Sequence, residues 1–194
     1  MGCITLVRGD CMDYMPSMPE KCFGLAVADP LLGIDYRAGR CEPPAERYFT
    51  ELFRVSRDQI VFGGNRFGLP PTRGIVCWDR MYRGETGPQW EMAWTSFDKP
   101  PKVFKYVSRG RDANGVKQKP EALYRWLLKT YARCDGPVLD THGGSVNLGR
   151  AALALGVELT VFVREPERFE KMCGSLAGAY GKIWVREDSV EQER

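Results

Sequence analysis

The last third of the sequence narrows the choice of fold most, because short apolar runs alternate there with amphipathic runs of helical spacing. Strands are expected at residues 137–139, 158–163 and 182–185, and helices at residues 120–133, 148–156 and 166–180. Strand–helix–strand alternation implies parallel pairing, because the helix returns the chain to the starting edge of the sheet. The pattern therefore predicts a layered α/β sheet.

The first two thirds add further strand-like runs to this sheet. Strands are expected at residues 4–7, 24–28, 59–62, 74–78, 92–95 and 102–107, with a helical turn at 13–18 and a helix at 45–55. The run Leu25 to Ala28 is wholly apolar, as is typical of a strand covered on both faces. Pro30 and Gly33 follow it and end the strand.

Length and composition limit the kinds of protein that this chain can be. The 194 residues suffice for one domain with a sizeable core, so a single domain over 1–194 is expected. No apolar run reaches membrane-spanning length, and we expect no signal peptide. Seven dispersed cysteines and one histidine favour free thiols in a reducing cytosol over a metal site. The net charge of +3 permits a nucleic-acid partner, but a solvated surface explains it equally well.

Three short motifs follow predicted strands. They are RGDC at residues 8–11, DPLL at 29–32 and LDTHGGS at 139–145, and each has an acid or a glycine-rich turn just past the strand. Two such turns that meet at the switch point of a parallel sheet form a crevice of nucleotide size. The simpler interpretation of any one motif is that its glycines make turns and its aspartate caps a helix. Three motifs in one chain favour a site.

Several stretches of the chain resemble the β-class DNA adenine-N6 methyltransferases, particularly their small phage and prophage members. ITLVRGDCMDYMPSMPEKCFGLAVADPLLGID is similar to their first part, in which Gly-Asp-Cys, a helix and a strand ending Asp-Pro-Pro-Tyr-Gly follow one another. GGNRFGLPPTRGIVCWD, EMAWTSFDKP, QKPEALYRWLL and VLDTHGGS resemble later parts. The Asp-Pro motif precedes the glycine-rich motif, which is the permuted order of the β class.

The resemblance implies a Rossmann-like methyltransferase sheet with helices on both faces. It also implies S-adenosylmethionine as cofactor and an adenine that is flipped out of duplex DNA into the site. Asp29 and the Pro30 carbonyl would accept hydrogen bonds from the adenine amino group, with Leu31 and Leu32 completing the catalytic turn.

The same resemblance implies the residues that would hold the cofactor. They are Asp10 at its adenine, Gln118, Lys119 and Pro120 at its amino-acid end, and Asp140, Gly144 and Ser145 beneath its methionine. Cys11 and His142 are further cofactor candidates, and Arg164 occupies the position of the ribose acid, which its neighbour Glu165 could serve only if the register shifts. No metal ion is implied.

Basic residues in three polar loops are candidates for DNA binding. The loops span residues 35–46, 80–90 and 108–117, and the arginines are Arg37, Arg40, Arg80, Arg109 and Arg111. Facing phosphates, they would add affinity without sequence selectivity. An ordinary solvated surface is the alternative for any one of them. Double-stranded DNA is the expected partner, in the cytoplasm of a bacterial or phage-infected cell, and a homodimer is left open.

The chain departs from the family pattern where methyl transfer would occur. Leu31 and Leu32 replace a proline and an aromatic residue, Val146 follows the glycine-rich turn, and Arg164 aligns with the acid that holds the ribose. Loss of a base–aromatic stack costs about 1–3 kcal/mol, and a β-branched residue in place of glycine restricts the backbone. Three hypotheses follow: a working or weakened adenine-N6 methyltransferase, an inactive relative that binds DNA or a protein, and an enzyme with an altered, more anionic donor.

Overall fold

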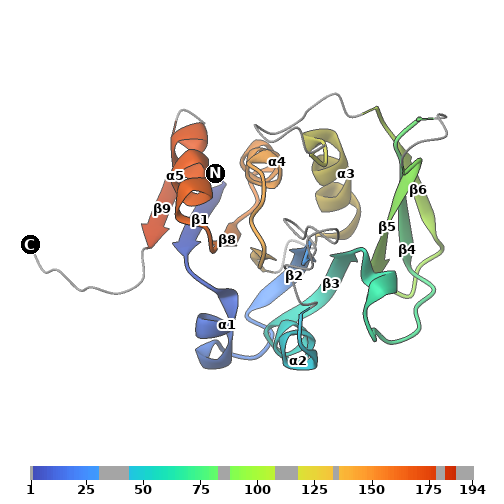
Figure 1. The fold of residues 1–194 in the computed structure, drawn as a ribbon, viewed down its shortest axis with the longest axis horizontal. Helices are drawn as coiled ribbons and strands as arrows, with labels where there is room; N and C mark the ends of the chain where they lie inside the picture. The colour runs from blue at the N-terminus through green and yellow to red at the C-terminus, as the bar shows by residue number, and fades with distance from the viewer. Residues whose placement is uncertain are drawn as a thin grey trace, which may run out of the picture.

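The computed structural model describes residues 2–30, 44–82, 88–107, 118–132, 136–177 and 182–186. In this part of the chain, one sheet of nine strands has the order β6-β4-β5-β3-β2-β7-β8-β1-β9. Figure 1 shows α3, α4 and α5 over one face of the sheet and α1 and α2 over the other. The arrangement confirms the predicted layered α/β sheet with helices on both faces.

One half of the sheet is parallel throughout, as the alternation predicts. Its strands are β1 (Cys3–Arg8), β2 (Phe23–Ala28), β7 (Val138–Asp140), β8 (Leu159–Val163) and β9 (Lys182–Arg186). Its helices are α1 (Cys11–Tyr14), α2 (Glu46–Val55), α3 (Glu121–Tyr131), α4 (Asn147–Leu155) and α5 (Pro166–Leu176). Helices lie between these strands along the chain because a parallel pair needs a crossover connection.

The other half of the sheet contains an antiparallel strand that the sequence pattern did not indicate. β5 (Trp90–Thr95) lies between β3 (Ser56–Phe62) and β4 (Ile75–Asp79) and is antiparallel to both. β6 (Lys102–Lys105) then pairs in parallel with β4 at the sheet edge. As a result, the amino end of β5 lies at the same edge as the carboxyl ends of β3 and β4.

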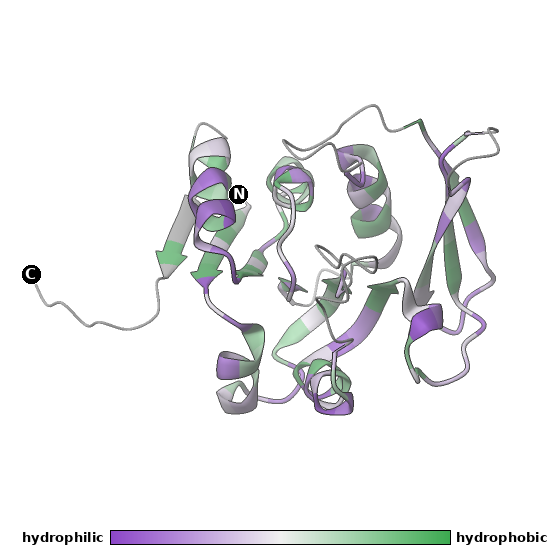
Figure 2. Cartoon of the chain, in the orientation of Figure 1, coloured by the Kyte–Doolittle hydropathy of each residue, from purple (hydrophilic) through white to green (hydrophobic). Residues whose placement is uncertain are grey.

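Apolar side chains fill the space on both faces of the sheet. Trp78 and Phe62 belong to the larger cluster, together with Leu127 of α3. Tyr48 and Leu52 of α2 belong to the cluster on the opposite face. Figure 2 shows mostly apolar residues in the central strands, with polar residues in part of β3 and in β6, and polar residues on the outer sides of the helices. The central strands are thus buried between two apolar layers, and the candidate site residues lie at the strand ends.

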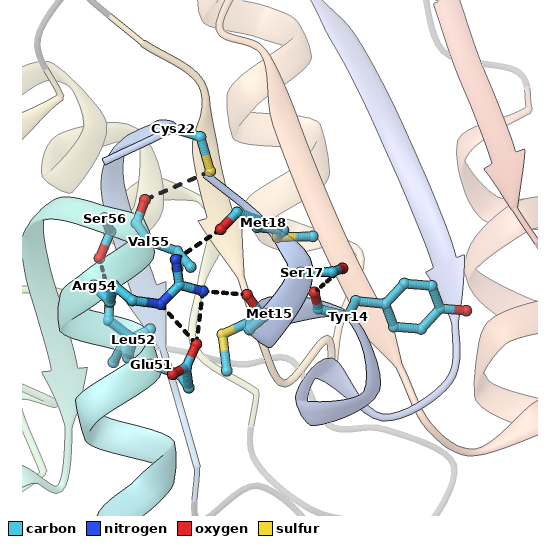
Figure 3. Close-up of polar contacts among 10 residues, drawn as sticks. All are labelled: Tyr14, Met15, Ser17, Met18, Cys22, Glu51, Leu52, Arg54, Val55 and Ser56. Carbon is cyan, nitrogen blue, oxygen red and sulfur yellow. Dashed lines mark hydrogen bonds and ion pairs between the residues drawn. The ribbon is translucent and has the colours of Figure 1, made fainter. Parts of the chain in front are cut away.

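Arg54 fastens α2 to the turn that leads from β1 to β2 (Figure 3). Its guanidinium donates hydrogen bonds to the carbonyl oxygens of Met15 at 2.5 Å and Met18 at 2.7 Å. The same group pairs with the Glu51 carboxylate of its own helix at 2.7 Å. The two carbonyls belong to the short helix η1 (Met15–Ser17) and its C-cap residue. Arg54 therefore holds α2 and η1 together on this face of the sheet.

A topological switch point lies between β2 and β7. From β2 the chain continues to its neighbour β3, and from β7 it continues to β8 on the opposite side. In open α/β sheets, ligands bind outside the carboxyl ends of the strands at such a point. Asp29 follows β2 and Asp140 ends β7, so two of the predicted motifs meet at this crevice.

Candidate functional site

Asp140 is a buried acid at the centre of the candidate site. Only 7% of this residue is exposed, and its carboxylate accepts a hydrogen bond of 3.0 Å from the His142 amide. Burial raises the pKa of Asp140 to about 7, and the negative charge of Asp29 adds to the shift, whereas Lys119 opposes it. Asp140 therefore takes up a proton near neutral pH.

Lys119 reaches the same crevice from the segment before α3. Its ammonium forms an ion pair with the Asp29 carboxylate and lies 3.2 Å from Glu91 Oε2. It also lies 4.5 Å from the centre of the Phe62 ring. The resemblance assigns Lys119 to the cofactor's amino-acid end, but the structure shows it bound to the acid of the DPLL motif. Glu91 was not among the predicted site residues.

Asn147 joins the glycine-rich loop to the segment that carries Lys119. Its side-chain amide donates a hydrogen bond of 2.8 Å to the Lys119 carbonyl and one of 3.5 Å to Gln118 Oε1. The Asn147 main-chain amide donates to Ser145 Oγ at 3.4 Å. Pro120 is buried and caps α3. The structure therefore brings the two predicted cofactor segments together, with Asn147 as the link.

A cavity of about 320 Å³ opens beside these groups. This volume is in the range of small-molecule sites, about 300–1,000 Å³. The lining combines the ends of β1, β7 and β8 with the start of α2. Its residues are Gly9, Asp10, Cys11, Met12, Pro30, Pro44, Ala45, Arg47, Tyr48, Thr141, His142, Gly143, Phe162, Arg164, Glu165 and Arg168.

The RGDC motif forms the β1 side of the cavity. Gly9 has a φ of 141°, which favours glycine, and it turns the chain into α1. Asp10 caps α1 through a 2.9 Å hydrogen bond from the Met12 amide to Oδ1. Cys11 is buried, and burial raises the pKa of its thiol far above its usual value, so it remains protonated. Asp10 is thus a helix cap and also part of the cavity lining.

Three side chains form a hydrogen-bonded group in the cavity wall. The Tyr48 hydroxyl lies 2.6 Å from Thr141 Oγ1, which lies 2.9 Å from His142 Nδ1. Burial lowers the pKa of His142 to about 4, so the imidazole is neutral at physiological pH. Neither Tyr48 nor Thr141 was predicted. The helical spacing that makes Tyr48 a core residue does not disclose its contact with a loop 93 positions away.

Arg164 and Glu165 both line the cavity at the end of β8. The Arg164 guanidinium lies 3.7 Å from the Asp10 carboxylate, and Arg168 lies 3.5 Å from Glu165. Arg164 is 77% exposed, so this pair contributes little to stability. The rim of the cavity at the end of β8 therefore carries positive and negative side chains. The Glu165 carboxylate lies one residue after the position at which the resemblance implies an acid for the cofactor ribose.

The glycine-rich turn packs closely on β8. A side chain at Gly143 would lie 2.4 Å from Val161 Cγ1, and the Gly143 amide donates a 2.8 Å hydrogen bond to the Phe162 carbonyl. Val146 has helical dihedral angles (φ −71°) and packs against the larger core cluster. It is not among the residues that line the cavity. The β-branched side chain of Val146 therefore does not obstruct a ligand in this cavity.

Arg80 differs from the free, phosphate-facing arginine expected at its position. Its guanidinium pairs with Glu91, its side chain is 12% exposed, and it lies 5.0 Å from the Trp78 ring. Burial lowers its pKa. An arginine bound in this way is a structural part of the sheet edge. The remaining candidates at the active-site turn and in the DNA-facing loops, Leu31, Leu32, Arg37, Arg40, Arg109 and Arg111, lie outside the described residues.

Metal-binding clusters and membrane-spanning helices are both absent from the residues that the structure describes. Within those ranges, no group of three or more His, Cys, Asp or Glu side chains is arranged to hold a metal ion. No helix there combines the length and apolar character needed to cross a membrane.

The fold is that of solved DNA methyltransferases, although sequence identity to them is low. A candidate DNA modification methylase from Thermus thermophilus, solved with S-adenosyl-L-methionine, superposes with a TM-score of 0.66 at 17% identity, over 95% of this chain and 98% of its own. M1.HpyAVI superposes with a TM-score of 0.62 at 14% identity, over 89% and 98%. No protein-family model matches this sequence, nor does any curated protein.

A third structural neighbour is a DNA methyltransferase that is described as specific for cytosine N4. The PvuII DNA methyltransferase, described as cytosine-N4-specific, superposes with a TM-score of 0.58 at 13% identity, over 94% of each chain. At these identities the likeness defines the fold alone. The class is therefore a methyltransferase-type Rossmann-like sheet, and the reaction must be argued from the site.

Proposed function

We propose that this chain is an S-adenosylmethionine-dependent DNA methyltransferase that acts on the N6 amino group of a flipped-out adenine. The observation that carries the proposal is the meeting of Asp29 and Asp140 at the switch point, beside a cavity lined by Asp10 and Glu165. Two structural neighbours, the Thermus thermophilus protein and M1.HpyAVI, have been solved with S-adenosylmethionine, which supports the choice of cofactor. When bound, S-adenosylmethionine supplies the methyl group.

Asp29 is the residue proposed to act on the substrate. Its carboxylate and the Pro30 carbonyl would accept hydrogen bonds from the exocyclic amino group, which increases the electron density on its nitrogen. Pro30 also lines the cavity, so the cofactor site and the acid are contiguous. An amino group of adenine and one of cytosine present the same donors, and the adenine assignment is supported by the resemblance of the chain to the adenine-N6 enzymes.

The cavity fits the adenosine half of the cofactor in size and in polar groups. Asp10 Oδ1 is used as the helix cap, which leaves Oδ2 at the rim. The neutral imidazole of His142 and the Thr141 hydroxyl offer uncharged hydrogen-bonding groups. Phe162 lines the cavity with an apolar ring surface. These groups would bind and orient the nucleoside and exclude water from it.

DNA would approach the carboxyl edge of the sheet. Trp90 is 56% exposed and Tyr106 is 43% exposed, and both flank the end of β4, since Asp79 pairs with Trp90 and its carbonyl accepts from the Tyr106 amide. Exposed aromatic rings at such an edge can stack on unpaired bases. Arg37, Arg40, Arg109 and Arg111 are proposed to add phosphate contacts.

The test is methyl transfer from labelled S-adenosylmethionine to duplex DNA, followed by nucleoside analysis. N6-methyladenine is expected in the product, and its loss in Asp29→Ala is expected without loss of folded protein. N4-methylcytosine in its place would overturn the adenine assignment. A wild-type protein that binds DNA but transfers no methyl group would instead favour the inactive, DNA-binding relative, which the departures at Leu31 and Leu32 support.

A further inference from the structure

One ammonium group serves two carboxylates at the active-site edge. Lys119 pairs with Asp29 at the end of β2 and, at 3.2 Å, with Glu91 Oε2 of β5. The Lys119 side chain is 11% exposed, and Asp29 and Glu91 are 15% and 24% exposed. A buried ammonium is unfavourable without a negative partner, so Lys119 must keep at least one of these two contacts.

Glu91 is itself fixed from the other side. Its Oε1 pairs with Arg80, whose guanidinium lies 5.0 Å from the Trp78 ring. Its Oε2 faces Lys119. The four groups thus form a row of alternating charge, Asp29, Lys119, Glu91 and Arg80, that begins at the candidate catalytic acid. Asp29 is the end of this row that adjoins the crevice.

The proposed reaction requires the oxygen atoms that Lys119 now contacts. Asp29 must accept a hydrogen bond from the substrate amino group, and a base that enters the site must compete with the ammonium for it. If Lys119 had no second carboxylate, its displacement would leave a buried charge without a partner. Glu91 removes this cost, because it already lies within ion-pair distance of Nζ.

We propose that Glu91 is a positioning residue that holds Lys119 when Asp29 turns from the ammonium to the target base. No proton is transferred and no bond is formed or broken in this step; Lys119 exchanges a contact with Asp29 for a closer contact with Glu91. The inference rests on the proposed function, because it concerns the availability of Asp29 to an amino group. It assigns to β5 a part in substrate binding that its sequence does not reveal.

Steady-state methyl transfer by Glu91→Gln tests the exchange. The amide keeps the shape of the side chain but not its charge, so Lys119 is left with Asp29 alone, and the base must displace a full ion pair. The KM for DNA is expected to rise about tenfold, with kcat and the affinity for S-adenosylmethionine within about twofold. Glu91→Asp should restore part of the wild-type KM. Asp98→Asn, which breaks the exposed Arg73–Asp98 pair, is the matched control and should leave KM unchanged.

A double-mutant cycle separates this role from a merely structural one. In the Lys119→Gln background, Glu91→Gln should have no further effect on the KM for DNA, because no ammonium remains to be held. Thermal unfolding of each variant confirms that it is folded, and Lys119→Arg replaces Lys119→Gln if the latter does not fold; the KM rise should then persist.

Three results would overturn the inference. They are an unchanged KM for DNA in Glu91→Gln, a KM rise of the same size when Glu91→Gln is added to the Lys119→Gln variant, and a fall in kcat and in melting temperature with KM unaltered. If the wild-type protein itself transfers no methyl group, the proposed function fails together with the inference. If it is active and Glu91→Gln has the wild-type KM, only the inference fails.

Discussion

The Tyr48 hydroxyl lies 2.6 Å from Thr141 Oγ1 and thereby joins helix α2 to the turn after β7. Both residues are buried, at 4% exposure each. Burial raises the pKa of Tyr48 well above its usual value, so the phenol stays protonated. The Tyr48 and His142 rings also meet edge to face, with centroids 5.2 Å apart. Tyr48 of α2 therefore positions Thr141 and His142, which form part of the cavity wall.

Tyr48→Phe should remove the hydrogen bond to Thr141 and keep the aromatic ring in the cavity wall. Thr141 keeps its contact with His142, so we expect a loss of about 1–2 kcal/mol in the free energy of unfolding, measured by urea denaturation. Binding of S-adenosylhomocysteine, measured by calorimetry, should weaken several-fold. Phe53→Tyr on the same helix adds a hydroxyl away from the cavity and is the comparison for a general aromatic effect. Unchanged binding in Tyr48→Phe would show that the turn is positioned by other contacts.

Asp140 and His142 should give opposite pH dependences of stability. Between about pH 4 and pH 6.5, folded Asp140 holds a proton that the unfolded chain has lost, so its contribution decreases as pH rises. In the same range, folded His142 is neutral while the unfolded histidine is charged, so its contribution increases as pH rises. The two effects oppose each other in the wild-type protein.

Single variants separate the two contributions. Relative to wild type, Asp140→Asn should gain about 1 kcal/mol of stability per pH unit across this window, and His142→Asn should lose about as much. Urea denaturation at half-unit pH intervals measures both slopes. Parallel curves for all three proteins would mean that neither group is titrated differently in the folded state.

Gly143→Ala should destabilise the protein through close packing. The added methyl group would lie 2.4 Å from Val161 Cγ1 and 2.9 Å from Val163 Cγ2. We expect a loss of about 1–3 kcal/mol by urea denaturation. Gly174→Ala is the control, because among the described residues no atom outside the backbone of its own helix lies within 4 Å of the added group; it should gain about 0.5–1 kcal/mol. Equal effects at the two sites would contradict the packing argument.

Arg164→Glu should distinguish the ordinary donor from a more anionic one. An acid at this position can accept hydrogen bonds from ribose hydroxyls, so S-adenosylhomocysteine should bind the variant about tenfold more tightly. A second calorimetric titration uses adenosine 2′,5′-bisphosphate as a probe for a more anionic donor. If the wild-type protein prefers the bisphosphate and Arg164→Glu loses it, the altered-donor hypothesis is favoured instead.

The salt dependence of DNA binding tests the arginine-rich loop at residues 108–117. Removing two phosphate contacts with Arg109→Ala and Arg111→Ala should reduce the slope of log K against log salt by about 2. Fluorescence anisotropy with a labelled duplex from low to moderate salt measures it. Arg73→Ala is the control, since Arg73 precedes β4 at the opposite edge of the sheet. A slope equal to that of wild type would place the loop away from DNA.

Local patterns were sufficient to predict the parallel half of the sheet and the acids at its strand ends. Asp29 and Asp140 follow short apolar runs, and the helices between those runs require parallel strands, so the two acids must face one edge. The predicted boundaries shift by a few residues at some ends. β6 ends at Lys105, and α5 ends at Leu176.

The pairing partners of these acids could not be predicted from the sequence. Lys119 and Asp29 are 90 positions apart, and neither periodicity nor spacing relates them. Glu91 reaches the site only because β5 runs antiparallel between β3 and β4, and the sequence has no helix there from which the direction could be inferred. Arg80 is in a polar loop by composition, but its ion pair with Glu91 holds its side chain against the end of the sheet, over the Trp78 ring.

The position of β1 in the sheet bears on how this chain acquires its structure. Ile4 pairs with Leu159 on one side and with Ile183 on the other, so β1 pairs only with strands that are made about 150 residues or more after it. At a synthesis rate of about 5–20 residues per second, several seconds or more pass before either strand that pairs with β1 has been made. Such long sequence separations slow folding. The RGDC end of the cavity therefore cannot form before β8 has been made, and the nascent chain cannot bind the adenosine half of a cofactor until then.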